Sequence, residues 1–450
     1  MLKSFIKQLF LCFILFPSNA FCMEEGDIDH DEDFSELSNF SINGYQLSND
    51  EYGHITSLNN SLNESPLFRT SNLKNKQWLD AERTALGGEI VTLETADQCL
   101  VTCYYFNNGK DKIVLVAPGF GGGFEEMMPL IEIYKDYDVL LLDYWGHGPH
   151  DARDESKTAW YRNPADRFFS ERFRREHLDI EAALAFINNP AVNGKESEYT
   201  EIIGAGNCYS TLVLSKVQAD AEQNNSKAFD KLIFDSSWLS THSVALKVAH
   251  DPYLSFDQIH GNAPWLLQKF MDIPYLDKGL LKLGEAVLGI DLDEHSILQH
   301  LPHITCPILF IQGTGDKLVT TEEFQTILDN SDAPRLVLTT PFKHSVVRFK
   351  GKEICKFAVN LFIDNPDALM MDQSNAREML EDFSSNKASE PAQTYSHTSY
   401  TVVPQPKKFF NTTNTIVSLV TLGAALFVFY VLYTAPGNKT ITTNAMANLK

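Results

Sequence analysis

Residues 202–212 read IIGAGNCYSTL, and this stretch decides the fold. A short apolar strand runs into a turn in which Gly206 and Ser210 stand two positions before and after Cys208. A strand-to-helix turn this sharp requires small residues on both flanks, because larger side chains would collide with neighbouring strands. The residue at its tip is held in strained backbone geometry, where the N–H groups and the dipole of the following helix point toward it. In that field a cysteine becomes a thiolate, and therefore a nucleophile, more easily.

Runs typical of β-strands stand on both sides of this stretch. They span residues 89–93, 100–106, 113–117, 139–143, 201–203, 231–235, 308–312 and 335–339, with helical patterns between most of them, as at 175–188. Several runs, such as IVLVA and VLLLD, are apolar throughout, which is typical of parallel strands that helices cover on both faces. The first two runs alternate and lie close together, which indicates an antiparallel edge. We therefore expect an α/β fold with a mostly parallel, doubly wound sheet.

A glycine-rich turn, APGFGGG, ends the strand at 113–117. Backbone N–H groups exposed after a strand can hold a developing oxyanion. By position, the donors would be the backbone N–H groups of Phe120 and Tyr209. A phosphate-binding loop is the rival interpretation, but the Gly-Lys-Ser/Thr sequence and the spacing of a dinucleotide turn are both missing.

An acid and a histidine follow the last two strands. Asp316 comes after the strand at 308–312 and two glycines, and His344 comes after the strand at 335–339. A histidine can take the proton of a nucleophile, and an acid can hold that histidine in the required tautomer. The chain order is thus Cys208, Asp316, His344.

With these landmarks in this order, residues 88–364 resemble the α/β-hydrolase superfamily, with Cys in place of Ser at the nucleophile. The segment VLLLDYWGHG at 139–148 is similar to the turn after the fourth strand of that family. The resemblance implies that Cys208 attacks the substrate and that His344 takes the thiol proton and later protonates the leaving group. It also implies that Asp316 orients the histidine and stabilises the imidazolium.

The sequence departs from the usual family pattern in ways that affect the expected chemistry. A thiolate at position 208 suits thioesters and acyl transfer at least as well as esters. Ser210 stands where the family has Gly, which crowds the turn slightly. Asp235 follows another strand and is an alternative acid that some relatives use, although Asp316 is preferred. An exported thiol would also face an oxidising compartment, so Cys208 would have to be sheltered in order to react.

The insert at residues 239–304 is long for a connection between strands. Its large apolar side chains are Trp265, Leu266, Leu267, Phe270, Met271, Tyr275, Leu280, Leu281, Leu283 and Val287. By the resemblance, this density implies a helical cap over the active site and a small-molecule or lipid-like acyl substrate. The alternative is that these side chains only complete the core.

Both ends of the chain carry membrane-targeting patterns. Residues 1–22 combine a positive start, a short apolar run and small residues before a plausible cleavage site, which is typical of a signal peptide. Residues 416–434 read IVSLVTLGAALFVFYVLYT and would rise about 28 Å as a helix, the thickness of a bilayer core. We expect a single-pass membrane protein whose domain at 88–364 is exported (periplasmic, lumenal or extracellular) and whose residues 435–450 form a short tail.

Two polar stretches bracket the domain. Residues 23–87 begin with many acids and continue rich in Asn and Ser, which indicates a flexible region. The alternating acids at 27–33 lack the Gly and Glu that an EF-hand loop needs at its sixth and twelfth positions. Residues 365–408 are polar again and are typical of a linker.

Composition limits the partners. The formal net charge of −22 and the pI near 5.0 argue against nucleic-acid binding, because a phosphate backbone would be repelled. Seven cysteines in 450 residues are too few for a disulfide scaffold. No pair of His or Cys residues has zinc spacing on a suitable scaffold, so we expect no metal, and we expect no cofactor.

Three functions are compatible with these residues. The first is a membrane-tethered Cys-His-Asp hydrolase that cleaves esters or thioesters through an acyl-cysteine intermediate. The second is an acyltransferase that uses the same intermediate with an acceptor other than water. The third is a non-catalytic binding protein that has kept only the hydrolase-like fold.

Overall fold

The computed structural model describes residues 40–48, 50–51, 83–84, 86–119, 123, 127–128, 130–145, 175–250, 292, 295–345, 351–372 and 374–388, apart from the side chains of 248–250 and 384–388. All of them belong to one of the two units into which the chain divides, Leu11–Gln393. The expected signal peptide (1–22), transmembrane helix (416–434) and tail (435–450) lie outside the described residues. Among the residues that are described, no helix has the length and apolar character needed to cross a bilayer.

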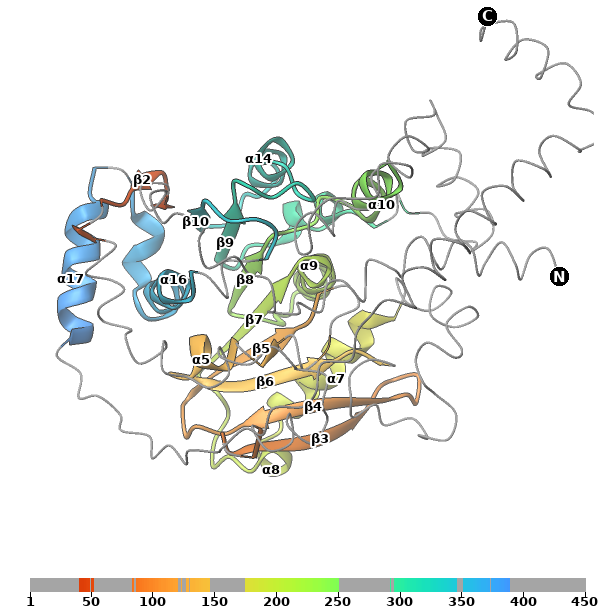
Figure 1. Cartoon of the computed structure of the whole chain (residues 1–450). Helices are drawn as coiled ribbons and strands as arrows, with labels where there is room; N and C mark the ends of the chain where they lie inside the picture. The colour runs from red at the N-terminus through yellow and green to blue at the C-terminus, as the bar shows by residue number, and fades with distance from the viewer. Residues whose placement is uncertain are drawn as a thin grey trace, which may run out of the picture. The chain divides into compact units, whose positions relative to one another are not determined.

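In the described part of the chain, ten strands form one sheet in the order β2-β1-β10-β9-β8-β7-β5-β6-β4-β3 (Figure 1). Their bounds are β1 Ser41–Ile42, β2 Tyr45–Gln46, β3 Gly88–Glu94, β4 Leu100–Phe106, β5 Lys112–Ala117, β6 Asp138–Asp143, β7 Glu201–Asn207, β8 Lys231–Asp235, β9 Ile308–Gly313 and β10 Arg335–Thr340. The six strands from β5 to β10 pair in parallel, whereas β4 is antiparallel to both β3 and β6. The eight strands predicted from the sequence coincide with β3 to β10, and the antiparallel edge is confirmed. This order and these connections make an α/β-hydrolase fold.

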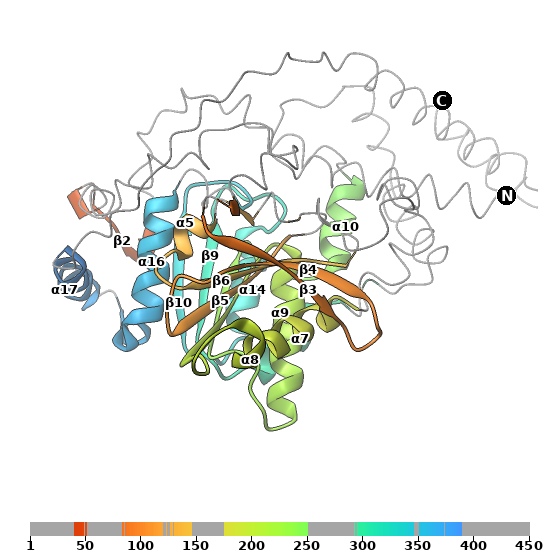
Figure 2. The same cartoon turned by 90° about the horizontal axis from the view of Figure 1, so that it is seen from below.

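Helices cover both faces of the sheet (Figures 1 and 2). One face carries α7 (Glu176–Ile187), α9 (Tyr209–Gln223), α10 (Thr241–His250) and α14 (Thr321–Asp329), and the other carries α5 (Leu130–Tyr134) and α16 (Lys352–Asp364). Side chains alternate along each strand, so Ile113 and Leu115 of β5 pack in the core beneath α9, while Val114 and Val116 pack in the core beneath α16. Strands covered in this way must be apolar throughout, as the sequence of β5 is.

An N-terminal hairpin extends the sheet beyond the predicted domain. Strands β1 and β2 pair antiparallel, and β1 lies antiparallel along β10. Phe40, Ile42 and Leu47 are almost completely buried, and the N–H of Asn43 donates to the carbonyl of Val337 at 2.8 Å. The expected flexible region at 23–87 is therefore wrong for residues 40–48. These residues are mostly polar, but they include three apolar side chains that pack into the core.

A helix also occupies part of the expected linker at 365–408. After α16, a 3-10 turn, η9 (Pro366–Met370), leads to α17 (Ala376–Ala388). Leu380 and Phe383 of this helix are buried, and the ring of Phe383 lies 5.5 Å from that of Phe357 in α16. The linker prediction is wrong for residues 366–388, because one apolar face of α17 packs on the domain.

The expected cap at 239–304 is described at its two ends. It begins with α10 and ends with two 3-10 turns, η7 (Ile297–Gln299) and η8 (Leu301–His303). A β-bridge joins Ser240 to Ser296, so the insert leaves and re-enters the fold at one place. Residues 251–291 lie outside the described part, so the cap itself stays a prediction.

Candidate active site

Cys208 stands at the tip of the turn between β7 and α9. Its backbone is strained, with φ 57° and ψ −122°, a region that residues other than glycine seldom adopt. A Cβ added at Gly206 would lie 2.7 Å from Leu214 Cδ1 and 3.0 Å from Ser210 Cβ, which explains why the turn needs glycine there. The N–H of Cys208 donates to the carbonyl of Asp235 at 2.8 Å, and this bond fixes the turn against β8. The strand predicted at 201–203 runs on to Asn207, directly to this turn.

Asp316 lies in the turn after β9, and its carboxylate is fully engaged. Oδ1 accepts the N–H groups of Leu318 at 2.8 Å and Val319 at 2.9 Å. Oδ2 accepts Nδ1–H of His344 at 2.7 Å and lies 3.4 Å from the Gln312 amide nitrogen. The side chain of Asp316 has no exposed surface, so this network holds a buried carboxylate in one orientation.

His344 lies in the turn after β10, next to the turn that carries Asp316. The two strands are parallel and adjacent, so their carboxyl ends meet at the same edge of the sheet. The N–H of Gly315 donates to the carbonyl of Phe342 at 3.0 Å, which ties the two turns together. A Cβ added at Gly313 would lie 2.1 Å from that same carbonyl oxygen, so the close approach depends on glycine.

The charge state of His344 is set by its two neighbours. Burial alone would lower the pKa of the imidazole, but the electrostatic contributions of Asp316 and Cys208, with hydrogen bonds to both, raise it well above its ordinary value. Nδ1 donates to Asp316, so the other ring nitrogen, Nε2, is left for proton exchange with the sulfur. Cys208 is a free cysteine and is not part of a disulfide. The structure therefore brings together all three residues that the sequence singled out, in an arrangement that can hold a thiolate beside an imidazolium.

Of the two expected oxyanion donors, the structure describes Tyr209. Tyr209 is the first residue of α9, so its N–H stands at the positive end of that helix. Phe120 lies outside the described residues. The hydroxyl of Ser210 donates to the carbonyl of Pro118, which bonds the nucleophile turn to the glycine-rich turn after β5.

A second network, missed by the sequence analysis, joins the nucleophile turn to the histidine turn. Asp235, the alternative acid, accepts the hydroxyl of Ser236 at 2.9 Å on its carboxylate. The oxygen of Ser236 in turn accepts the N–H of Ser345 at 2.9 Å, directly after His344. The acid bonded to His344 is thus Asp316, and Asp235 instead braces the two turns. Nothing in the sequence around Ser236 signals this role, because it depends on a positive φ of 53°.

Within the ranges described, no three His, Cys, Asp or Glu side chains gather closely enough to hold a metal ion.

No protein-family model matches the chain, and no curated protein sequence matches it significantly. Among solved structures, an esterase from Pyrococcus furiosus is similar at 18% identity, over 64% of this chain and 92% of its own, with a TM-score of 0.44. DcsB, solved with a substrate analogue, is similar at 14% identity over 62% of this chain and 99% of its own, with a TM-score of 0.43. A bacterial membrane phospholipase A is similar at 14% identity over 64% of this chain and 89% of its own, with a TM-score of 0.40. Likenesses this distant concern the fold alone, which the strand order already defines.

Proposed function

We propose that this chain is a hydrolase that cleaves ester or thioester bonds of small-molecule or lipid-like acyl substrates, with Cys208 as the nucleophile. The observation that carries the proposal is the 2.7 Å hydrogen bond between Asp316 and a buried His344 whose imidazole also interacts with Cys208. A histidine that served only to stabilise the fold would not require a strained cysteine on one side and a fully hydrogen-bonded carboxylate on the other. Strain and buried charge of this kind cluster at functional sites.

The first half of the reaction forms an acyl-cysteine. The Cys208 thiolate attacks the substrate carbonyl carbon, and the negative charge that develops on the carbonyl oxygen is held by the N–H groups of Tyr209 and Phe120. The C–O or C–S bond to the leaving group then breaks, and His344 gives its Nε2 proton to the departing alkoxide or thiolate. Asp316 keeps Nδ1 protonated throughout, so that Nε2 is the nitrogen that exchanges the proton.

The second half regenerates the thiol. Neutral His344 takes a proton from a water molecule, and the resulting hydroxide attacks the thioester carbonyl. The C–S bond to Cys208 breaks and a carboxylic acid is released, while the imidazolium–thiolate pair is restored. An amine, alcohol or thiol that replaces water in this step would make the protein an acyltransferase.

We further propose that the domain is exported and tethered to a membrane through residues 416–434. The charge-free apolar run of bilayer length and the signal-like residues 1–22 support this. The burial of Cys208, which is 3% exposed, would shelter its thiol in an oxidising compartment. Extraction of cell membranes with alkaline carbonate tests the tether, since a spanning chain stays with the lipid, and release of the chain would reject it.

Hydrolysis of a chromogenic ester and of a matched thioester by the purified full chain tests the reaction. We expect Cys208→Ala to abolish both activities, and a thiol-directed acyl probe with peptide mass mapping to label Cys208 in the unmodified protein. Cys306→Ala is the matched control. Cys306 is also buried, but burial raises the pKa of its thiol to about 12, and it lies just before the amino end of β9, whereas Cys208 lies just after the carboxyl end of β7.

Three outcomes separate the functions. Loss of activity and label in Cys208→Ala alone supports the hydrolase. Acyl product that exceeds free acid when amines, alcohols or thiols are added identifies an acyltransferase. Activity that is unchanged in Cys208→Ala rejects the proposed nucleophile.

A further inference from the structure

The loop that carries Asp316 is held by hydrogen bonds at both of its ends. Gln312 donates to the carbonyl of Val319 at 3.1 Å, and the N–H of Thr320 donates to the carboxylate of Glu323 at 3.0 Å. Glu323 also closes a capping box with Thr320 at the start of α14. These contacts come from the sheet and from α14, and they account for the two ends of the loop.

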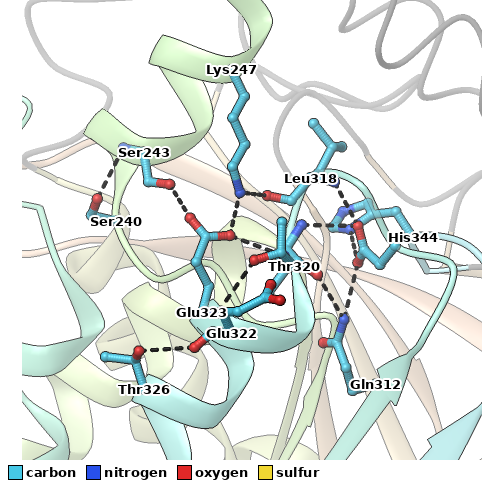
Figure 3. Close-up of polar contacts among 12 residues, drawn as sticks. Ser240, Ser243, Lys247, Gln312, Leu318, Thr320, Glu322, Glu323, Thr326 and His344 are labelled. Atoms are coloured by element: carbon cyan, nitrogen blue, oxygen red, sulfur yellow. Dashed lines mark hydrogen bonds and ion pairs between the residues drawn. The ribbon is translucent and has the colours of Figure 1, made fainter.

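One remaining contact comes from the start of the inserted segment. Lys247 of α10 donates from Nζ to the carbonyl of Leu318 at 2.7 Å and forms an ion pair with Glu323 (Figure 3). Ser243, one turn earlier in α10, donates its hydroxyl to the other carboxylate oxygen of Glu323. The side chain of Lys247 is 24% exposed, so this cation is partly withdrawn from water to reach a main-chain oxygen.

The carbonyl that Lys247 binds belongs to the peptide unit between Leu318 and Val319. The N–H of that same unit donates to Oδ1 of Asp316 at 2.9 Å, and Oδ2 of Asp316 accepts from His344 at 2.7 Å. A cation on the carbonyl polarises the peptide and strengthens donation by its N–H. The chain of contacts therefore runs from α10 through one peptide unit to the acid and then to the histidine.

We propose that Lys247 is a positioning residue, which fixes the Leu318–Val319 peptide so that Asp316 meets Nδ1 of His344, and which couples the placement of α10 to the charge state of that histidine. The proposal rests on the proposed function, because it concerns the same Cys208–His344 pair. The charges that act on His344 directly are those of Asp316 and Cys208. Lys247 and Glu323 contact the loop that carries Asp316, and Asp235 contacts Ser236.

The direction in which loss of Lys247 moves the titration of His344 distinguishes a positioning role of Lys247 from a direct effect of its charge. Removal of a nearby positive charge, by itself, makes an imidazolium easier to hold and moves its titration to higher pH. Loss of alignment between Asp316 and His344 weakens the imidazolium and moves the titration to lower pH. The two roles therefore predict opposite signs.

The experiment follows the alkylation of Cys208 by iodoacetamide between about pH 5 and pH 10 in the purified full chain, with Cys208 identified by peptide mass. The upper transition of the rate profile reports deprotonation of His344. We expect Lys247→Met to move this transition down by about half a pH unit or more and Lys247→Arg to restore it. If Lys247→Met is not recovered folded, Lys247→Gln is tested in the same way.

Lys195→Met is the matched control. Lys195 also donates to a carbonyl, that of Lys110 at 2.7 Å, and to a buried carboxylate, that of Asp138 at 2.8 Å, but these groups lie at the amino ends of β5 and β6. The Lys195→Met substitution should lower the free energy of unfolding and leave the pH of the upper alkylation transition unchanged. A transition that Lys247→Met leaves unchanged or moves up overturns the inference alone. A wild-type Cys208 that shows no such transition overturns the proposed chemistry and this inference with it.

Discussion

The hydroxyl of Ser210 donates a hydrogen bond to the carbonyl of Pro118, which links the first turn of α9 to the end of β5. Ser210 is completely buried, so its removal would leave a buried carbonyl without this donor, at a cost of about 1–3 kcal/mol. We expect Ser210→Ala to lower the free energy of unfolding by that amount. It should also reduce kcat about tenfold with little change in KM, because the two turns that would hold the oxyanion lose their fixed spacing.

Urea unfolding and steady-state kinetics on a chromogenic ester check this prediction. Ser210→Gly is the matched variant, because glycine is the residue that the family resemblance leads one to expect and it too lacks the hydroxyl. Both variants should lose kcat to a similar degree. If either keeps full kcat, the bond to Pro118 has no part in holding the oxyanion turn.

The identity of the acid can be tested with two isosteric changes. Asp316→Asn keeps the size of the side chain but removes the charge beside His344, and we expect kcat/KM to fall by about 10²–10⁴. Asp235→Asn keeps an oxygen that can accept the hydroxyl of Ser236, and we expect a loss below about tenfold. The ratio of the two kcat/KM values is the measurement. A larger loss in Asp235→Asn would assign the acid to β8 instead.

The raised pKa of His344 makes stability depend on pH. Burial opposes the charged form, but Asp316 and Cys208 outweigh it, so the folded-state pKa lies above the unfolded value of about 6.5. Protonation then stabilises the fold. This contribution is complete below about pH 6.5 and is lost as the pH rises toward the folded-state pKa, at up to about 1.4 kcal/mol per pH unit.

Urea unfolding of the wild type and of His344→Gln over a pH series measures this contribution. The difference in free energy of unfolding between the two proteins should shrink as the pH rises above about 6.5. A difference that grows with pH would mean that the fold prefers the neutral imidazole, and the ion pair with Cys208 would then be excluded.

The close approach of the acid and histidine turns makes a further prediction. A Cβ at Gly313 would lie 2.1 Å from the carbonyl oxygen of Phe342, whereas a Cβ at Gly315 would lie 3.2 Å from it. Backbone atoms cannot move aside as a flexible side chain can. We expect Gly313→Ala to cost about 3 kcal/mol or more in free energy of unfolding and Gly315→Ala about 1 kcal/mol, as measured by urea unfolding. Equal costs would show that the two turns can separate without disturbing the fold.

The sequence predicted the central sheet well for a physical reason. Strands buried on both faces must be apolar throughout, and runs such as IVLVA and VLLLD leave few alternatives. The order Cys208, Asp316, His344 was readable because each of these residues follows a strand. Parallel strands of one sheet place the residues that follow them at the same end of the sheet. Hydrogen bonds between side chains and main-chain groups left no such signal in the sequence. The roles of Ser236 and Lys247 depend on which carbonyl or N–H lies nearby, and composition does not carry that information.

The boundaries of the domain were the least predictable part of the fold. The segment around Phe40 reads as polar, because its three buried side chains are diluted among Asn, Ser and Gly. An edge strand of two residues is too short to show an alternating pattern. The helix α17 is likewise mostly polar, with one narrow buried face.

The hairpin at residues 40–48 should matter for activity as well as for stability. Phe40 is completely buried, and its ring lies 5.5 Å from that of Phe342, edge to face, two residues before His344. We expect Phe40→Ala to cost about 3–5 kcal/mol in free energy of unfolding. It should also lower kcat under conditions where the protein remains folded, because the turn that positions the histidine loses its support.

Phe383→Ala separates these two effects. Phe383 is also buried, but it packs against Phe357 of α16 and not against the histidine turn. Its loss should lower stability to a comparable degree, as measured by urea unfolding, while kcat of the folded protein stays within about twofold of the wild type. If Phe40→Ala kept the wild-type kcat at a temperature where circular dichroism shows it folded, the hairpin would serve only to cover the edge of β10. A selective loss of kcat would instead make residues 40–48 part of the support for His344.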